Sequence, residues 1–386
     1  MPDDATSTAA QSAAPQLAAP TELESQAECA VGTGLFMVAA GAAQASGLVL
    51  FGWETLRVLI FSCLSAVIGD YVVRRILRRQ EKYARRRAVL VGMLVACTLP
   101  ASAHWPVPVV AGGIGAVAGL VIANAKGRRL WHPAALGRVA VQIFFADQLS
   151  LARWPVLAPG YLLSGDLSAT QPLPPLATWD SPPGFGGQAW EVLRPADVLA
   201  ATVPAHTGAS PAAAIAALVR DALPPWSHTL TGVAGGAIGE ACAFAIIAVG
   251  LVLAWRGRAR LNVPIMGVLA GGLLAAVLPV AIRTDDGAVL SHWLPGLAVW
   301  DGLPVGALYV LYHLTAGEFL LVLILLAADP SSSPSTGGGR WLFGAIIGGL
   351  TITLRVLTGV PAAGYWALLI ANTLVPLMNH VRRRPS

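Results

Sequence analysis

Residues 56–87 read LRVLIFSCLSAVIGDYVVRRILRRQEKYARRR, an apolar run (56–73) followed directly by a dense group of arginines. An α-helix made of that run would be roughly 27 Å long, close to the ~30 Å thickness of a bilayer's hydrocarbon core. Basic residues that follow an apolar span remain on the cytoplasmic side of the membrane. The stretch therefore predicts a transmembrane helix whose C-terminal end lies in the cytoplasm.

The composition extends this interpretation to the whole chain. Of the 386 residues 55% are hydrophobic and only 12% are charged, and the mean hydropathy is +0.66, values typical of an integral membrane protein. The net charge of +5 comes from arginines grouped between apolar runs, which indicates topology signals and no nucleic-acid partner. The cysteines lie far apart without a CxxC pair, so we expect no zinc site, covalent haem or complete iron–sulfur ligand set.

The alternation of apolar runs and basic groups repeats along the chain. We expect ten membrane helices, at about 30–52, 56–73, 88–103, 106–124, 132–146, 229–255, 262–282, 304–327, 341–358 and 362–379. Basic groups at 74–87, 126–129, 256–260, 340 and 382–384 fall where this count places the cytoplasm. The fold class predicted is an all-α integral membrane protein of the bacterial inner membrane, with both termini in the cytoplasm.

A long polar insert divides these helices into two groups of five. We expect a first half at 29–146, a periplasmic insert at 147–228 and a second half at 229–386. An odd number of helices in each half predicts that any internal duplication is an inverted repeat. Residues 1–28 contain acidic residues and no Lys or Arg, which favours a disordered cytoplasmic tail over a secretory signal.

The insert contains the stretch Ser164-Gly165-Asp166-Leu167-Ser168-Ala169-Thr170-Gln171-Pro172-Leu173. Small residues around Thr170 leave its hydroxyl accessible to the active site of another protein. No cluster of Cys, His or carboxylates lies nearby, so we expect no catalytic residue here and interpret the loop as an attachment site. The alternative is that any long loop rich in Gly, Ser and Pro contains such a triplet by chance.

Four strings of sequence, taken in order, resemble the NqrB/RnfD family, the ten-helix flavoprotein subunits of sodium-pumping NADH:quinone reductase and of the Rnf ferredoxin:NAD oxidoreductase. They are Leu130-Trp131-His132-Pro133-Ala134-Ala135-Leu136-Gly137-Arg138-Val139, the Ser168-Ala169-Thr170 triplet, Gly232 to Glu240, and Ala328-Asp329-Pro330 with Gly339-Arg340-Trp341, Arg355 and Asn372 to Leu377. His132 stands where the family has Asn, and Gln171 is an extra residue before the proline. The chain therefore resembles a divergent member.

The resemblance implies a cofactor and partners. Thr170 would carry FMN through a phosphoester to its hydroxyl, installed by a separate flavin transferase, with Ser168 as the fallback acceptor and Asp166 as the nearby carboxylate. A second, noncovalent flavin is left open. The partners implied are the other subunits of the electron-transport complex (Rnf A, B, C, E and G-like) and membrane lipids.

Charged residues inside apolar spans are costly in a membrane and indicate function or pairing. Glu240, expected in the sixth helix, would contact flavin or a cation path, or would be a packing residue. Arg355 would neutralise a flavin phosphate, pair with Glu240 or Glu318, or extend to the interface. Asp70 is spaced to pair with Arg74 at i,i+4.

Two isolated residues favour structural roles. His313 is expected to be a core histidine and not a haem ligand, and Asp329-Pro330 is expected to form a cap and turn.

The function expected is an electron-transfer subunit of an ion-translocating complex, not an enzyme alone, because no site for NADH or ferredoxin is visible in the sequence. The FMN would supply the redox chemistry and the protein its binding and electrostatics. Two alternatives stay open: a flavin-free channel of urea-transporter architecture, and a structural subunit that has lost its flavin.

Overall fold

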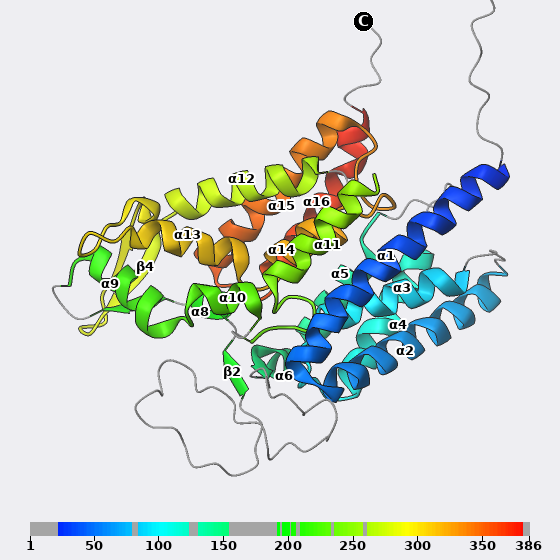
Figure 1. The fold of residues 1–386 in the computed structure, drawn as a ribbon, viewed down its shortest axis with the longest axis horizontal. Helices are drawn as coiled ribbons and strands as arrows, with labels where there is room; N and C mark the ends of the chain where they lie inside the picture. Colours follow the sequence, from blue (N-terminus) through cyan, green and yellow to red (C-terminus); the bar gives the residue numbers. More distant parts are fainter. Residues whose placement is uncertain are drawn as a thin grey trace, which may run out of the picture.

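The computed structural model describes residues 22–78, 84–122, 130–153, 191–193, 195–200, 202–205, 209–232, 235–257 and 261–380. Long helices pack side by side into one bundle, and short helices and strands gather at one of its ends (Figure 1). The start of α1 and the end of α16 lie at the other end. An even number of crossings would place the two termini in this way.

The helices of the first half are α1 (Glu22–Phe51), α2 (Trp53–Leu77), α3 (Ala84–Cys97), α4 (Pro106–Val121) and α5 (Pro133–Phe144). Both α4 and α5 begin with a proline, which has no N–H to lose at the first helical position. Together these elements cover each of the first five predicted spans.

The second half follows the same order but contains more irregular helix. Its elements are α11 (Ala243–Trp255), α12 (Asn262–Val277), α13 (Val305–Thr315), α14 (Phe319–Leu321) continued by the π-helix Val322–Leu326, α15 (Gly337–Thr353) continued by the π-helix Leu354–Thr358, and α16 (Ala363–His380). Wide π-turns are frequently found at functional sites.

Helix packing repeats between the two halves. The most extensive contacts join α2 to α4 in the first half and α12 to α15 in the second, and α4 with α5 corresponds to α15 with α16. Glycines permit these close approaches: a Cβ on Gly112 would lie 2.4 Å from the Ser62 carbonyl oxygen, and one on Gly348 would lie 2.0 Å from that of Gly267. These glycines therefore have a packing role between helices.

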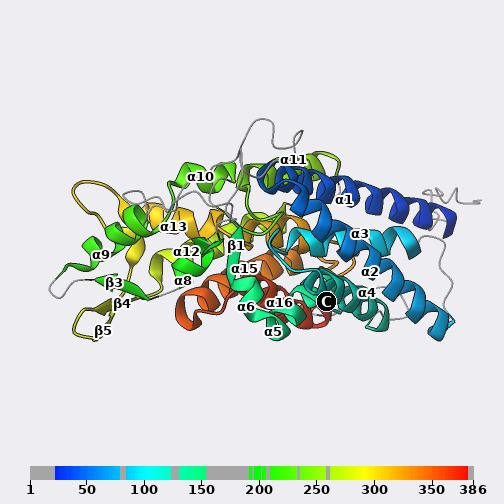
Figure 2. The same ribbon diagram turned by 90° about the horizontal axis from the view of Figure 1, so that it is seen from below.

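Contacts between the halves are made by equivalent helices. The α1 helix packs against α11, and α5 packs against α16 (Figure 2). One continuous apolar core runs through both halves and includes Phe51, Leu99, Phe319, Phe343 and Leu368.

The described parts of the insert are short. They are α6 (Ala146–Ser150), β1 (Leu151–Arg153), β2 (Glu191–Leu193), α8 (Pro195–Ala200), β3 (Val203–Ala205), α9 (Pro211–Ala217), the π-helix Leu218–Ala222 and α10 (Trp226–Thr231). The antiparallel pair β1–β2 aligns Leu151 with Leu193. This pairing brings together the two ends of the segment 154–190, which lies outside the described residues.

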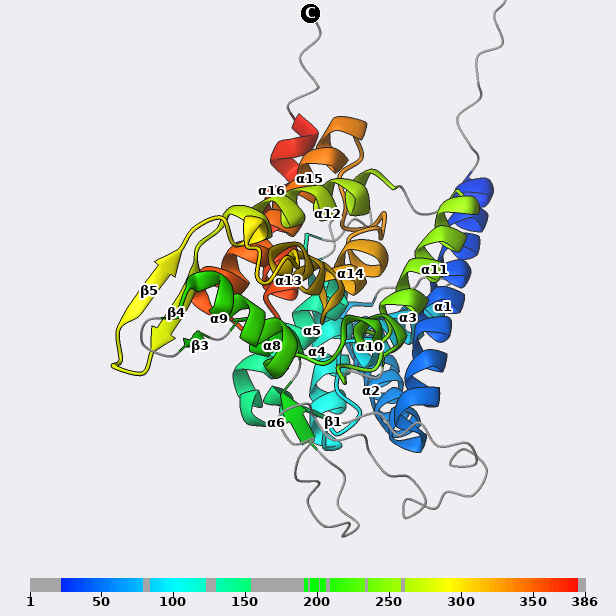
Figure 3. The same ribbon diagram turned by 60° about the vertical axis from the view of Figure 1, so that its left-hand side comes forward.

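A second small sheet joins the insert to the second half. Strand β4 (Val280–Thr284) is central, with β3 parallel on one side and β5 (Val289–His292) antiparallel on the other. The sheet lies at the side of the bundle, remote from the C-terminus (Figure 3). Its buried face joins a second apolar cluster with Ile215, Leu218 and Tyr312.

The prediction of an all-α protein is thus right for most of the chain and wrong at these two sheets. The span predicted at 262–282 ends at Val277, because Leu278 is already extended and residues 280–284 find their backbone partners in the sheet. The sixth and eighth predicted spans are each broken. In their described residues, the interruptions include Gly232 and Gly235 in the sixth span and Gly317 in the eighth. These glycines have φ of 95°, 75° and 72°, which a helix cannot accommodate.

By length and apolar composition, three helices in the described part of the chain are able to cross a membrane: Gly32–Phe51, Trp53–Leu77 and Gly337–Thr358. Val305–Thr315 with Phe319–Leu326, bent by 53°, makes a fourth if the bent pair is one span. The apolar helices α4, α5, α11 and α12 are shorter. The structure therefore shows a mostly helical chain with several candidate spans, and the count of ten stays a prediction.

Candidate functional site

Charged side chains lie inside the bundle, where α3, α5, α15 and α16 meet the two broken spans. Arg138, Glu240, Glu318 and Arg355 are all at most 2% exposed. An ion in such a place is costly unless it is hydrogen-bonded or faces an opposite charge. The contacts of these four residues therefore define the candidate site.

Glu240 lies in a turn of the non-helical segment 235–242 between α10 and α11, and the prediction that it lies within a helix is wrong. The Tyr365 hydroxyl on α16 donates a hydrogen bond to its Oε1 atom. The Arg138 guanidinium lies 5.6 Å from the centre of the Tyr365 ring, on the side of α5. The Tyr365 side chain therefore lies close to both the carboxylate of Glu240 and the guanidinium of Arg138.

The break that holds Glu240 is stabilised by a second break. The α3 helix ends at Cys97, and the extended backbone after it pairs with the segment before Glu240: Gly239 N donates to Cys97 O at 2.8 Å and Ile238 N to Leu99 O at 3.0 Å. A Cβ on Gly239 would lie 2.6 Å from the Cβ of Cys97. Position 239 thus requires glycine. The backbone N–H groups that have no helical partner at the break are hydrogen-bonded by carbonyls of the other half of the protein.

Arg138 stabilises the same crossing from α5. Its Nε atom donates to the carbonyl of Thr98 at 3.0 Å, and its Nη1 atom donates to Gln142 Oε1 at 2.6 Å. A guanidinium is suited to this position because it carries several donors and a fixed positive charge. The signal that could have identified Arg138 was a lone arginine within the fifth apolar run.

Glu318 and Arg355 form a buried ion pair. Arg355 Nη2 lies 2.9 Å from Glu318 Oε1, so pairing with Glu318, one of the alternatives considered, is the one observed. Arg355 Nη1 also donates to the carbonyl of His313 at 2.9 Å, and Nη2 to that of Ala316 at 3.5 Å. Arg355 therefore satisfies carbonyls left without helical partners where α13 ends.

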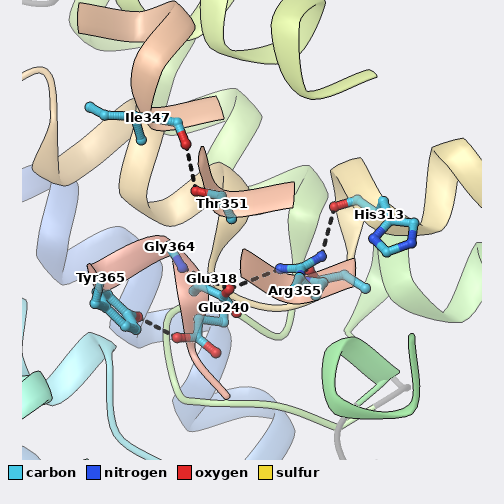
Figure 4. Close-up of polar contacts among 9 residues, drawn as sticks. Glu240, His313, Glu318, Ile347, Thr351, Arg355, Gly364 and Tyr365 are labelled. Atoms are coloured by element: carbon cyan, nitrogen blue, oxygen red, sulfur yellow. Dashed lines mark hydrogen bonds and ion pairs between the residues drawn. The ribbon is translucent and has the colours of Figure 1, made fainter. Parts of the chain in front are cut away.

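The start of α16 connects both carboxylates. Gly364 N donates to Glu318 Oε1 at 3.1 Å, and the next residue, Tyr365, donates to Glu240. Figure 4 shows the two glutamates approaching this turn from different segments, with Arg355 beyond Glu318. Neither Gly364 nor Tyr365 was predicted from the sequence, because a glycine and a tyrosine in an apolar run carry no signal without their partners.

The electrostatics of the site are balanced in formal charge, with two arginines and two glutamates. The Glu318–Arg355 pair is in direct contact, and the Tyr365 side chain contacts both Glu240 and Arg138. Removing one partner of a buried pair leaves an uncompensated charge and typically costs about 3–5 kcal/mol. The arrangement can therefore hold the broken helices together while it keeps Glu240 in a distinct, hydroxyl-bonded environment.

The insert contacts this site through α8. A Cβ on Gly317 would lie 2.6 Å from the Cβ of Ala196 on α8, so α8 lies directly on the break of the eighth span. A cavity of about 240 Å³ lies beside it, lined in part by Thr202, Tyr309 and Thr358. The C-terminal end of the insert is thus packed next to the residue that precedes Glu318.

A further polar cluster, around Asp329, His132 and Asn372, lies away from this site. On Asp329, Oδ1 accepts from the Ser331 N–H at 2.9 Å and Oδ2 from its hydroxyl at 2.8 Å, which confirms the expected turn. The buried His132, where α5 begins, has its Nε2 atom 3.6 Å from Asp329 Oδ2. The side-chain oxygen of Asn372 accepts a hydrogen bond from the backbone N–H of His132 at 3.0 Å, and its amide nitrogen donates to the carbonyl of Ser332 at 3.2 Å. These contacts join two of the four strings on which the family resemblance rests, the first and the fourth.

Other predictions have mixed outcomes. Asp70 and Arg74 form the expected i,i+4 ion pair, with Oδ2 and Nε 2.7 Å apart. His313 is buried against the edge of the Tyr309 ring at 4.5 Å between centroids, but neither of its ring nitrogens has a hydrogen-bond partner among the described residues. It is a core histidine, as predicted, but not a hydrogen-bonded one.

Thr170, Ser168 and Asp166 lie outside the described residues. No group of three or more His, Cys, Asp or Glu side chains in the described ranges is placed to hold a metal ion. The part of the chain that the structure describes therefore positions charged and hydroxyl groups, not a metal site.

Broken apolar helices around buried ion pairs define this molecule as a multi-pass helical membrane protein with an ionisable interior site. Comparison of the sequence with known families shows the family to which it belongs. Residues 20–386 match the NQR2, RnfD, RnfE family, and the chain belongs to it. The resemblance recognised from the sequence is thereby confirmed.

Relatives with assigned names span most of the chain, and each is named as the D subunit of an ion-translocating oxidoreductase complex. The relative from Halorhodospira halophila (strain DSM 244 / SL1) is 26% identical over 355 residues, covering 89% of this chain and 87% of its own length. The relative from Stutzerimonas stutzeri is 29% identical over 357 residues, covering 87% and 86%. That from Sodalis glossinidius (strain morsitans) is 28% identical over 333 residues, covering 86% of each.

Proposed function

We propose that this chain is the D subunit of an ion-translocating, Rnf-like electron-transport complex, and that it carries FMN as a phosphoester on Thr170. The observation that carries the proposal is the family match over residues 20–386, together with relatives of nearly equal length named for that role. The remaining subunits (A, B, C, E and G-like) would supply the other redox centres, and a flavin transferase would attach the FMN.

The chemistry of the attachment loop fits a phosphoester. A threonine hydroxyl between small residues is accessible, but it is a weak nucleophile without an adjacent base, so a separate enzyme is required. In the described residues, the β1–β2 pair closes the segment 154–190 at its base. When bound, FMN supplies one- and two-electron transfer.

The interior site gives the protein's own residues a role beside that cofactor. Because α8 packs on Gly317, the end of the flavin-bearing insert lies next to the Glu318–Arg355 pair. Gly364 and Tyr365 continue that contact to Glu240. We assign Glu240 to redox-coupled function, in which its charge would respond to the electron on the insert, and Glu318 with Arg355 to fixing the geometry.

Topology forms part of the same proposal. We propose ten spans in two inverted halves, with the insert in the periplasm and both termini in the cytoplasm of the inner membrane. The support is the repeated packing of α2 with α4 and α12 with α15.

Reporter fusions after Leu173 should behave as periplasmic, and fusions after Arg258 as cytoplasmic. The reverse pattern at either point would refute the assigned orientation.

Flavin attachment is tested by mass spectrometry. The peptide that contains Thr170, isolated from cells with an active flavin transferase, should carry one added FMN group. The mass and the in-gel flavin fluorescence should disappear in Thr170→Val and persist in Ser168→Ala, which serves as the matched control. An unmodified wild-type peptide would favour a flavin-free channel or structural subunit.

A further inference from the structure

An apolar turn at residues 293–303 is exposed at the end of the bundle that carries the insert. It connects β5 to α13 and packs on the C-terminal end of α12, where a Cβ on Gly296 would lie 2.6 Å from that of Ala276. The large apolar side chains that it exposes are Trp293, Leu294, Leu297, Val299, Trp300 and Leu303. Asp301, in the tight turn between Trp300 and Leu303, is exposed as well. Leu297 is 75% exposed and Trp293 61%. We call this segment the 293–303 turn.

The backbone of the 293–303 turn is largely satisfied within the protein. Trp300 and Leu303 exchange both N–H···O bonds, at 3.0 and 2.9 Å, Leu297 N donates to Leu294 O at 3.0 Å, and Leu294 N reaches Val277 O at 3.3 Å. A non-helical segment requires such internal pairing when it lies at membrane depth, because lipid offers its backbone no partners. The turn meets this requirement at the residues named.

The α12 helix is too short to cross the hydrocarbon by itself. Its 16 residues make a helix of about 24 Å, against ~30 Å of hydrocarbon. Its exposed apolar residues Ile265, Leu269 and Leu273 are spaced at i, i+4 and i+8, and form a stripe along its outer face. The 293–303 turn continues the apolar surface from the point where α12 ends.

We propose that the 293–303 turn is a membrane anchor that inserts into the phospholipid layer at this end of the bundle. Its two tryptophans have the amphipathic character that favours the boundary between headgroups and acyl chains. Leu294 has a left-handed backbone (φ 58°), unfavourable for a bulky residue, and its side chain is nevertheless exposed. The polar turn between β4 and β5, with Asp285, Asp286 and Gly287, lies further along the same hairpin and would remain in water.

The anchor has a consequence for the insert that goes beyond the proposed function. Strand β4, which leads toward the turn through β5, also pairs with β3, aligning Ile282 with Val203 of the insert. Lipid contact at the turn would thus set the depth at which the end of the insert is held. The height of the insert above the membrane would be fixed by the bilayer and not only by protein contacts.

A photocrosslinking experiment tests the occupant of this surface. A benzophenone amino acid is placed singly at positions 297, 269 and 287 of the full-length protein, assembled in its complex and reconstituted in phosphatidylethanolamine/phosphatidylglycerol vesicles. Position 269 on the α12 stripe is the control for lipid contact, and position 287 is the control for water. Adducts are identified by mass spectrometry after irradiation.

The expected result is a phospholipid adduct at position 297 at a yield within about threefold of that at position 269, with none at position 287. A crosslink from position 297 to another subunit would overturn the proposal, because a protein would then cover the turn. An absent adduct at position 297, with lipid adducts at position 269, would overturn it as well, because the turn would then face water.

Discussion

The Glu318–Arg355 pair provides a quantitative test of the interior site. Both side chains are 2% exposed, and their charged atoms are 2.9 Å apart. Arg355→Met removes the cation and leaves the Glu318 carboxylate buried, and it also removes donors from the carbonyls of His313 and Ala316. Glu318→Met leaves the guanidinium buried in the same way. We expect each single variant to lower the free energy of unfolding by about 3–5 kcal/mol.

The double variant should behave differently from the sum of the two. With both charges replaced by apolar side chains of similar size, the remaining cost is that of the two carbonyls without donors, about 1–3 kcal/mol each at most. The double variant should therefore be no less stable than Arg355→Met, which loses the same two donors and in addition leaves the Glu318 carboxylate buried without its partner. The coupling energy from the double-mutant cycle should be about 2 kcal/mol or more.

The assay is unfolding of the purified protein in detergent micelles, followed by circular dichroism during titration with a denaturing detergent. Arg256→Met is the matched control, because Arg256 is exposed after α11 and its loss should change stability by less than about 0.5 kcal/mol. Losses in the two single variants that add up in the double variant would refute the reasoning, since the two residues would then not act as a pair.

Three further outcomes follow from the same structure. Gly239→Ala should destabilise the protein by about 1–3 kcal/mol, because the new Cβ would lie 2.6 Å from the Cβ of Cys97. Gly113→Ala, with open space around it, should change the stability little. The unfolding midpoints of the two variants provide the comparison. The Glu240→Gln variant should assemble and bind flavin normally, while the rate of electron transfer through the complex, or its ion dependence, falls. Tyr365→Phe should shift the pH profile of that rate. Full activity in Glu240→Gln would make this glutamate a packing residue. The pKa of Asp286 is lowered by a hydrogen bond from a threonine hydroxyl and then by one from a backbone N–H. Its contribution to the order of the β4–β5 turn should therefore be fully present above pH ~4 and be lost as the pH falls through the lowered pKa. Protection factors for amide exchange in the turn that stay constant from neutral to acidic pH would contradict this.

The positions of the helices were determined largely by the local sequence. Each of the ten apolar runs contains a helix, because a run of apolar residues in lipid has to satisfy its own backbone and a helix does so within one segment. The i,i+4 pair of Asp70 with Arg74 was equally local. The family was recognisable for the same reason, since its motifs are short strings read in order.

The tertiary structure alone decided the breaks and their contents. The segment before Glu240 leaves the helix because Cys97 and Leu99 accept its backbone N–H groups, and these residues are more than 130 positions earlier in the chain. Whether Arg355 would pair with Glu318 or with Glu240 depended on where α16 begins, since Gly364 and Tyr365 direct the two carboxylates to different partners. Composition and periodicity could indicate that a buried charge needs a partner, but only the packing of distant segments could determine which partner it has.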